Sequence, residues 1–351
     1  MRGVFATMLA VYSDDNTLHD PDHFISRGVQ IAVRESPERV VQLQAALRDG
    51  GHVIRAPRDF GRDALLSVHD PRYIDFLANA YDNWQTLPQP RGPMVLANSY
   101  AMRQMKTLPT SFEGQLGFFL SGNSVPIGPQ SWRSIASSAN CALEAADTVR
   151  GGAAESYALC RPPGHHAYAD LAGGYCFLNN TALATQHLRG RFARVAVLDV
   201  DVHHGNGTQS IFWERGDVLT VSIHGDPNTG YPWQVGYAEE RGEGEGLGKN
   251  LNLPLPLGTT DAPYLAALDH ALAAIRAFDP EACVIALGLD AYEEDSSEMM
   301  RVTTAGFGAI GARIGAQKWP TVIVQEGGYA VDALRRNLGS FLNGFLSTRG
   351  A

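Results

Sequence analysis

The sequence predicts an α/β protein built in three layers, α/β/α, with helices on both faces of a mainly parallel, doubly wound sheet. Short β-rich runs alternate along the chain with helical patterns, which is the order of elements that such a sheet requires. The runs VAVLDV (195–200) and ACVIALGL (282–289) are apolar without alternation, which is typical of central strands covered on both faces. No internal repeat or linker divides the 351 residues, so we expect a single domain over 1–351.

The individual elements follow from these runs in chain order. The apolar run near the N-terminus lacks an A-x-A-like cleavage site, so we interpret it as a first strand and not as a signal peptide. We predict strands at Leu9–Tyr12, Val53–Ala56, Tyr157–Cys160, Val195–Asp201, Val218–His224, Cys283–Leu289 and Thr321–Gln325. We predict helices at Pro37–Asp49, Pro71 to about Trp84, Ser137–Val149, Asn180–Leu188, Ala262–Arg276, Thr304–Ile314 and Val331–Leu346.

One long segment interrupts this alternation. Residues 83–122 are irregular in pattern, with a centre rich in Pro, Gly, Met and polar residues. A loop of this length in a compact domain usually has a function or forms an interface. We therefore predict an insertion loop at about 83–122.

The composition excludes several classes of function. The chain has 28 Lys and Arg against 37 Asp and Glu, a net charge of -9, whereas nucleic-acid binding needs a basic face. No stretch approaches the roughly 18 apolar residues of a transmembrane helix. We expect neither a nucleic-acid nor a membrane partner. The four cysteines form no C-x-x-C pair, which predicts reduced thiols and a cytoplasmic location.

Chemically active residues follow four of the predicted strands. In α/β sheets, ligands bind beyond the carboxyl ends of the strands. These ends supply, in chain order, His165 and His166; Asp199, Asp201 and His203; Asp290; and Tyr329. We therefore expect carboxylates, imidazoles and a phenol at one edge of the sheet.

Three of these residues suggest a metal site. Asp201 and His203 are two positions apart, so both point to the same side of an extended chain. With Asp290 they form an Asp-His-Asp set, and three protein ligands with one open position is the plan of a catalytic zinc site. The same set would also accept iron(II) or another divalent ion. A capped loop would explain the D-x-H pattern alone, but it would not explain why chemically active residues follow four predicted strands.

The remaining residues suggest acid–base chemistry. His165 and His166 lie in a Pro-Gly turn, and Asp199 offers a carboxylate to the second ring nitrogen of a histidine. Tyr329 follows two glycines, so its hydroxyl can turn towards the site and donate to a developing oxyanion. Taken singly, these would be ordinary loop histidines and a packed tyrosine.

The same segments resemble a known family. RPPGHHA, GGYCFLNN, LDVDVHHGNGTQ, VSIHGDP, LGLDAYEED and QEGGY resemble the zinc-dependent deacetylase superfamily, which shares the arginase/deacetylase-like fold. SFEGQLGFF and YAEERGEGEG are similar to its branch of bacterial acetylpolyamine amidohydrolases. The resemblance covers nearly the whole chain. It implies an enzyme that hydrolyses a small cationic acetylated amine to acetate and a free amine.

The resemblance also implies a role for individual residues. Asp201, His203 and Asp290 would bind zinc, and Tyr329 would be the oxyanion donor. His165 would be paired with Asp199, and His166, the general base, with the neutral amide of Asn206. Tyr175 and Tyr231 would line a substrate channel, and Glu113 would meet a distal ammonium group. Structural potassium would bind at two places, one formed by Asp199, Asp201, His203, Ser222 and Ile223 and one by Phe212, Arg215 and Val218.

The insertion at about 83–122 resembles the segment with which acetylpolyamine enzymes dimerise and narrow their channel, which implies a homodimer. Two alternatives remain open: a deacetylase of acetyl-lysine in proteins, and a binding protein that keeps a metal for stability. His165, His166 and Tyr329 argue against the second, because metal binding alone does not need them. An arginase-like ureohydrolase is disfavoured, since DVDVHHGNG lacks the further carboxylates of a two-metal site.

Overall fold

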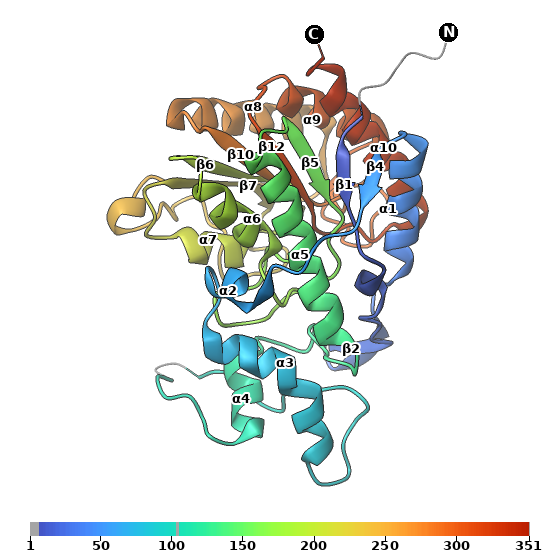
Figure 1. Cartoon of the computed structure of the whole chain (residues 1–351), viewed down its shortest axis with the longest axis vertical. Coiled ribbons are helices and arrows are strands. Elements are labelled where there is room, and N and C mark those ends of the chain that lie inside the picture. Colours follow the sequence, from blue (N-terminus) through green and yellow to red (C-terminus); the bar gives the residue numbers. More distant parts are fainter. Residues whose placement is uncertain (1–6, 103–104, 351) are drawn as a thin grey trace.

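The computed structural model describes residues 7–102 and 105–350, which form a sheet between two layers of helices (Figure 1). The strands of this sheet are β1 (Leu9–Val11), β4 (Val53–Arg55), β5 (Glu155–Ala158), β6 (Val195–Asp199), β7 (Val218–Gly225), β8 (Asn250–Leu255), β10 (Ala282–Leu287) and β12 (Thr321–Gln325). They lie in the order β4–β1–β5–β12–β10–β6–β7–β8, and every neighbouring pair is parallel. The predicted α/β class with a parallel sheet is therefore confirmed.

Helices cover both faces of the sheet. One face carries α1 (Glu38–Asp49), α8 (Asp261–Phe278), α9 (Thr304–Gly315) and α10 (Val331–Ser347); the other carries α5 (Ser131–Arg150), α6 (Asn180–Arg189) and α7 (Asn206–Phe212). Successive side chains of a strand point to opposite faces. Along β10, Cys283 and Ile285 pack into the first apolar core and Val284 into the second. This burial on both faces explains why the central strands show no polar alternation.

The predicted insertion loop is partly helical. The first residues of the segment form the end of α3 (Pro71–Thr86), and its last part forms α4 (Phe112–Phe119). Together with α2 (Gly61–Leu66) and the start of α5, these two helices enclose a third apolar cluster. Figure 1 shows α3 and α4 projecting beyond one end of the sheet. The side chain of Ser111 caps α4 by accepting a hydrogen bond from the N–H of Gly114 at 3.2 Å. The eight-residue helix contains Gly114 and Gly117, whose low helix propensity hides it in the sequence.

Several smaller elements lie outside the strands and helices predicted above, although LNLPLPLG (251–258) is strand-like in the sequence. β8 carries Pro254, which is tolerated because this strand lies at the edge of the sheet. A hairpin of β2 (His23–Ser26) and β3 (Val29–Ala32) and a short pair of β9 (Thr259–Thr260) and β11 (Met300–Arg301) lie outside the main sheet. Two short 3₁₀ helices, η1 (Asp14–Thr17) and η2 (Gly244–Gly246), complete the fold. Among the described helices, none has the length and apolar character that crossing a bilayer requires.

A buried ionic cluster joins the segment before α1 to two loops that follow strands. Glu35 Oε1 accepts a hydrogen bond from Arg39 Nη1 at 2.6 Å and lies 2.9 Å from Arg161 Nε. All three side chains are at most 1% exposed. Arg39 also donates to the carbonyls of Glu326 and Gly328, while Arg161 donates to carbonyls in the N-terminal segment. The cluster therefore fixes the loops after β5 and β12 relative to each other.

We predict that Glu35→Ala lowers the free energy of unfolding by about 3–5 kcal/mol, because it leaves two buried guanidinium groups without their carboxylate. The matched control is Arg335→Ala, which removes an exposed ion pair with Asp49 and should change stability far less. Urea denaturation of both variants gives the comparison. Similar small losses in the two variants would contradict the importance of the buried cluster.

Candidate active site

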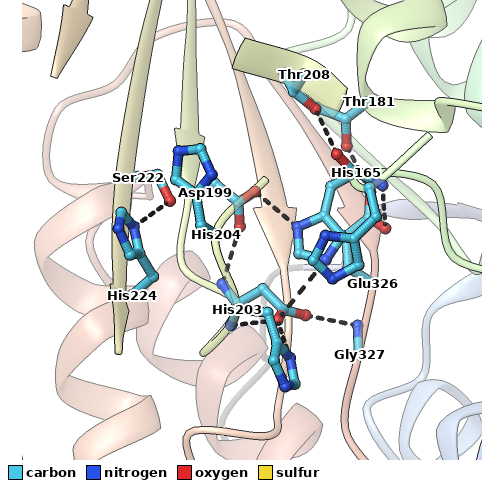
Figure 2. A network of polar contacts seen from close by, with 12 residues as sticks. His165, Thr181, Asp199, His203, His204, Thr208, Ser222, His224, Glu326 and Gly327 are labelled. Carbon is cyan, nitrogen blue, oxygen red and sulfur yellow. Dashed lines mark hydrogen bonds and ion pairs between the residues drawn. The ribbon is translucent and has the colours of Figure 1, made fainter. Parts of the chain in front are cut away.

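Four adjacent strands end at the candidate site. β5, β12, β10 and β6 are neighbours in the sheet, and the loops after them carry the tandem histidines, Tyr329, Asp290 and the Asp201–His203 pair. Because parallel strands end at one edge, residues more than a hundred positions apart in the sequence meet there. Figure 2 shows His165, Asp199, His203 and Glu326 drawn together in one polar network.

Asp201, His203 and Asp290 offer ligand atoms that all lie within 4.8 Å of one another. His203 Nδ1 lies 3.2 Å from Asp201 Oδ1 and 3.1 Å from Asp290 Oδ2. The second oxygen of each carboxylate accepts a backbone hydrogen bond, Asp201 Oδ2 from Gly327 at 2.8 Å and Asp290 Oδ1 from Val202 at 3.0 Å. These bonds orient both buried carboxylates towards the imidazole.

The donor set fits a divalent cation. Burial alone would lower the pKa of His203, but its hydrogen bonds to Asp201 and Asp290 raise it to about 10, so this point attracts positive charge. The backbone closes round the carboxylates: a Cβ at Gly327 would lie 2.3 Å from Asp290 Oδ2 and 2.6 Å from Asp201 Oδ2. This buried Asp-His-Asp group could therefore hold a metal ion.

The two tandem histidines lie beside this group with different partners. Their ring centroids are 4.0 Å apart, and both residues are buried. His165 Nδ1 lies 2.9 Å from Asp199 Oδ2, and His166 Nδ1 lies 2.6 Å from Asn206 Oδ1. An amide oxygen only accepts hydrogen bonds, so His166 carries its proton on Nδ1 and keeps Nε2 free as a base.

These different partners shift the pKa values of the two imidazoles in opposite directions. Burial opposes charge on both, but Asp199 and Asp201 outweigh it at His165 and raise its pKa to about 10. Burial, together with the neighbouring His165 and His203, holds the pKa of His166 well below its usual range. At neutral pH the site thus combines a cationic imidazole with a neutral one.

Aromatic rings surround the histidines and Tyr329. The Tyr231 ring lies edge-on to His166, with centroids 4.8 Å apart, and Tyr175 lies 5.8 Å from Tyr329. Burial and the nearby Asp290 hold the pKa of Tyr329 well above its usual range, so its hydroxyl stays protonated and can donate. A Cβ at Gly174, where φ is +54°, would lie 2.4 Å from His166 Cδ2, so this approach requires glycine.

The structure brings some of the other predicted residues to the site and leaves one apart. Ser222 pairs with Asp199 across β6 and β7, and its Oγ lies 2.8 Å from His224 Nδ1 (Figure 2). Ile223 is buried on β7, and the second predicted potassium group lies between α7 and β7. Within that group, the backbone carbonyl of Phe212 accepts a hydrogen bond from the backbone N–H of Arg215 at 3.0 Å. Glu113 is exposed on α4, outside the cluster of rings around His166.

Two positioning residues were not predicted. The buried carboxylate of Glu326 accepts hydrogen bonds from the backbone N–H groups of Gly164 at 2.6 Å and His165 at 3.1 Å, and from the Thr181 hydroxyl at 2.7 Å. Arg39 binds the carbonyls on either side of Gly327 and lies 5.2 Å from the centroid of the Tyr329 ring. A carboxylate directly after a buried strand, as in QEGGY, was the available signal for Glu326. Nothing in the SPERV segment revealed where Arg39 points.

Comparisons with known proteins agree with this geometry. The model of the histone deacetylase domain matches residues 33–345. The chain is 46% identical to an acetylpolyamine amidohydrolase of Burkholderia pseudomallei, over 98% of this chain and 100% of the relative, and 45% identical to acetylpolyamine amidohydrolase 1 of Pseudomonas aeruginosa, over 96% and 99%. A crystal structure of the acetylpolyamine aminohydrolase from Burkholderia pseudomallei superposes with a TM-score of 0.95, covering 97% of this chain and 99% of that one. The chain belongs to the histone deacetylase family.

Proposed function

We propose that the protein is a metal-dependent amidohydrolase that removes the acetyl group from acetylated polyamines or related small acetylated amines and releases acetate and the free amine. One observation carries the proposal: a cation-attracting Asp-His-Asp group, a neutral buried histidine and a protonated tyrosine converge at one edge of the sheet. Two relatives that match nearly the full length of the chain, at 46% and 45% identity, bear the name acetylpolyamine amidohydrolase, which supports the substrate class.

Asp201, His203 and Asp290 would hold one divalent ion. We propose zinc, with iron(II) or another divalent ion as the alternative, because two carboxylates and one imidazole accept either. When bound, such an ion would polarise the acetyl carbonyl and lower the pKa of water towards about 7.

The proton transfers belong to His166. Its depressed pKa leaves Nε2 unprotonated at neutral pH, and the bond from Nδ1 to Asn206 fixes the ring. His166 would take the proton of the attacking water and then give it to the leaving amine. The amide of Asn206, unlike a carboxylate, does not stabilise a lasting charge on this ring, so the proton can leave again.

Two further groups would stabilise the charge that develops on the substrate. Tyr329 would donate its hydroxyl hydrogen to the oxyanion formed from the acetyl carbonyl. His165, held by Asp199, would keep a positive charge beside it. Because neither group has to change its protonation state, the site needs little reorganisation during the reaction.

The charge and the rings suit a thin cationic substrate. Tyr175 and Tyr231 would flank its methylene chain, and Glu113 would meet a distal ammonium group. The net charge of -9 also favours a cationic ligand. We further propose structural potassium at the two predicted places, and a cytoplasmic location, which suits four buried free cysteines.

We predict that the purified protein with one equivalent of zinc hydrolyses acetylputrescine or longer acetylpolyamines at least about tenfold faster, in kcat/KM, than an acetyl-lysine peptide, a difference of about 1.4 kcal/mol. Released acetate provides the measurement. A clear preference for the peptide would overturn the proposed substrate and favour a protein deacetylase.

Two variants separate binding of the metal from chemistry in the same assay. Tyr329→Phe should retain the metal and lose about 100- to 1000-fold in kcat, as removal of an oxyanion donor typically does. Asp290→Ala should lose most of its metal, measured by elemental analysis. If Tyr329→Phe keeps activity within about threefold of wild type, far less than that loss, its proposed role is wrong.

We predict that Glu326→Ala lowers kcat with little change in metal content, because two buried N–H donors in the histidine loop lose their acceptor. Glu326→Gln is the matched control, since its amide oxygen can accept both bonds while its NH₂ donates to Thr181. It should restore most of the activity. Equal activity of the alanine variant and wild type would contradict the positioning role.

We also propose that residues 1–351 form one catalytic domain that assembles as a homodimer through the segment 83–122. The helices α3 and α4, at the two ends of this segment, project beyond the sheet (Figure 1). Between them, Met102 is 80% exposed. Stable interfaces bury on the order of 1,600 Å², which a projecting segment paired with its own copy could supply in large part.

We predict that the wild type sediments as a dimer at micromolar concentration and that Met102→Glu shifts it towards the monomer, because a charge would be buried at the contact. Val41→Glu, which charges a similarly exposed apolar position on α1, serves as the control. A monomeric wild type would exclude the dimer, and dissociation by both variants would place the interface elsewhere.

A further inference from the structure

A bulky residue with left-handed backbone geometry lies close to the active site. Trp233 has a φ of 58°, a region that side chains other than glycine rarely adopt and that is strained for a bulky residue. Such strain persists where the surroundings enforce it, and it concentrates at functional sites. Here the Trp233 N–H donates to the Gly230 carbonyl at 3.0 Å, and the Tyr237 hydroxyl donates to the Trp233 carbonyl at 3.2 Å. These two bonds therefore hold the backbone of the loop at Trp233.

One ring connects this indole to the proposed base. The Tyr231 centroid lies 4.8 Å from that of His166 on one side and 5.4 Å from that of Trp233 on the other, and both contacts are edge-to-face. Exposure rises along this series: His166 is 4% exposed, Tyr231 is partly buried and Trp233 is 54% exposed. The three rings thus lead outward from the buried base to solvent.

The chemistry of an indole matches one part of the proposed substrate. Among aromatic side chains, tryptophan attracts cations most strongly through the face of its ring. An acetylpolyamine that places its acetyl group at the Asp-His-Asp group extends a methylene chain away from it, with an ammonium group at the far end. The exposed indole is the outermost of the three rings that lead away from His166, so an ammonium that follows these rings to solvent would meet it.

We infer that Trp233 forms an outer cation subsite that binds the distal ammonium group of the acetylated amine and thereby sets the preferred chain length. The inference rests on the proposed function. It keeps Tyr231 on the methylene chain and adds Trp233 to Glu113 as a second group that would meet a distal ammonium. The edge-to-face contact with Tyr231 would help to position the indole before substrate binds, which lowers the conformational entropy lost on binding.

The test compares N-acetylated diamines of increasing length with neutral N-alkylacetamides of the same length. In the wild type, the charged compound should be preferred in kcat/KM, most strongly at one length. Trp233→Gly should reduce this preference by roughly 3- to 30-fold, through KM and with kcat unchanged, as expected for loss of one cation–π contact. Glycine adopts the left-handed conformation without strain, so this variant removes the ring and keeps the loop. Trp233→Phe should retain part of the preference.

Leu247→Ala removes another exposed apolar side chain, from a different turn, and should leave the preference unchanged. An equal loss on charged and neutral compounds, or an altered sedimentation coefficient of Trp233→Gly, would assign the indole to packing or to a protein interface and overturn the subsite. An unchanged preference in Trp233→Gly would overturn it as well, although the proposed activity would stand. Failure of the wild type to hydrolyse any acetylated diamine would instead refute the proposed function, and the subsite with it.

Discussion

The geometry of the candidate site depends on one buried carboxylate shared by two guanidinium groups. Glu35 binds Arg39 and Arg161, and each guanidinium group also donates hydrogen bonds to backbone carbonyls. Arg161 begins the loop that carries the tandem histidines, while Arg39 holds the loop that carries Tyr329. Buried charges are tolerated when they are paired, and here both guanidinium groups contact the Glu35 carboxylate. The cluster therefore sets the relative positions of His166 and Tyr329, and it contacts the ring of Tyr329 through Arg39.

Different hydrogen-bond partners give two chemically identical side chains at this site different protonation behaviour. His165 and His166 are neighbours with similar burial, yet a carboxylate faces the first and an amide faces the second. The result is a raised pKa in one ring and a depressed pKa in the other. Pairs of titratable groups that their surroundings drive apart in this way are characteristic of acid–base sites.

Residues that follow strands were predictable, because parallel strands end at one edge and carry their next residues to it. Asp201, His203 and Asp290 come together for this reason, although they follow two different strands, β6 and β10. The direction of the Arg39 side chain was not predictable, because its bonds to the Tyr329 loop are tertiary contacts that no local pattern encodes. The helix α4 and the strand β8 were obscured by glycine and proline, whose weak local propensities are overridden by packing and by an edge position.

The apolar cluster of α3 and α4 has a consequence for how such an enzyme can change over evolutionary time. Its buried residues form a group separate from the two cores that flank the sheet. Substitutions that reshape this projecting part therefore leave the strands beneath the Asp-His-Asp group undisturbed. Selectivity for one amine over another can drift, or be engineered by exchanging this part between relatives, while the hydrolytic machinery is inherited intact.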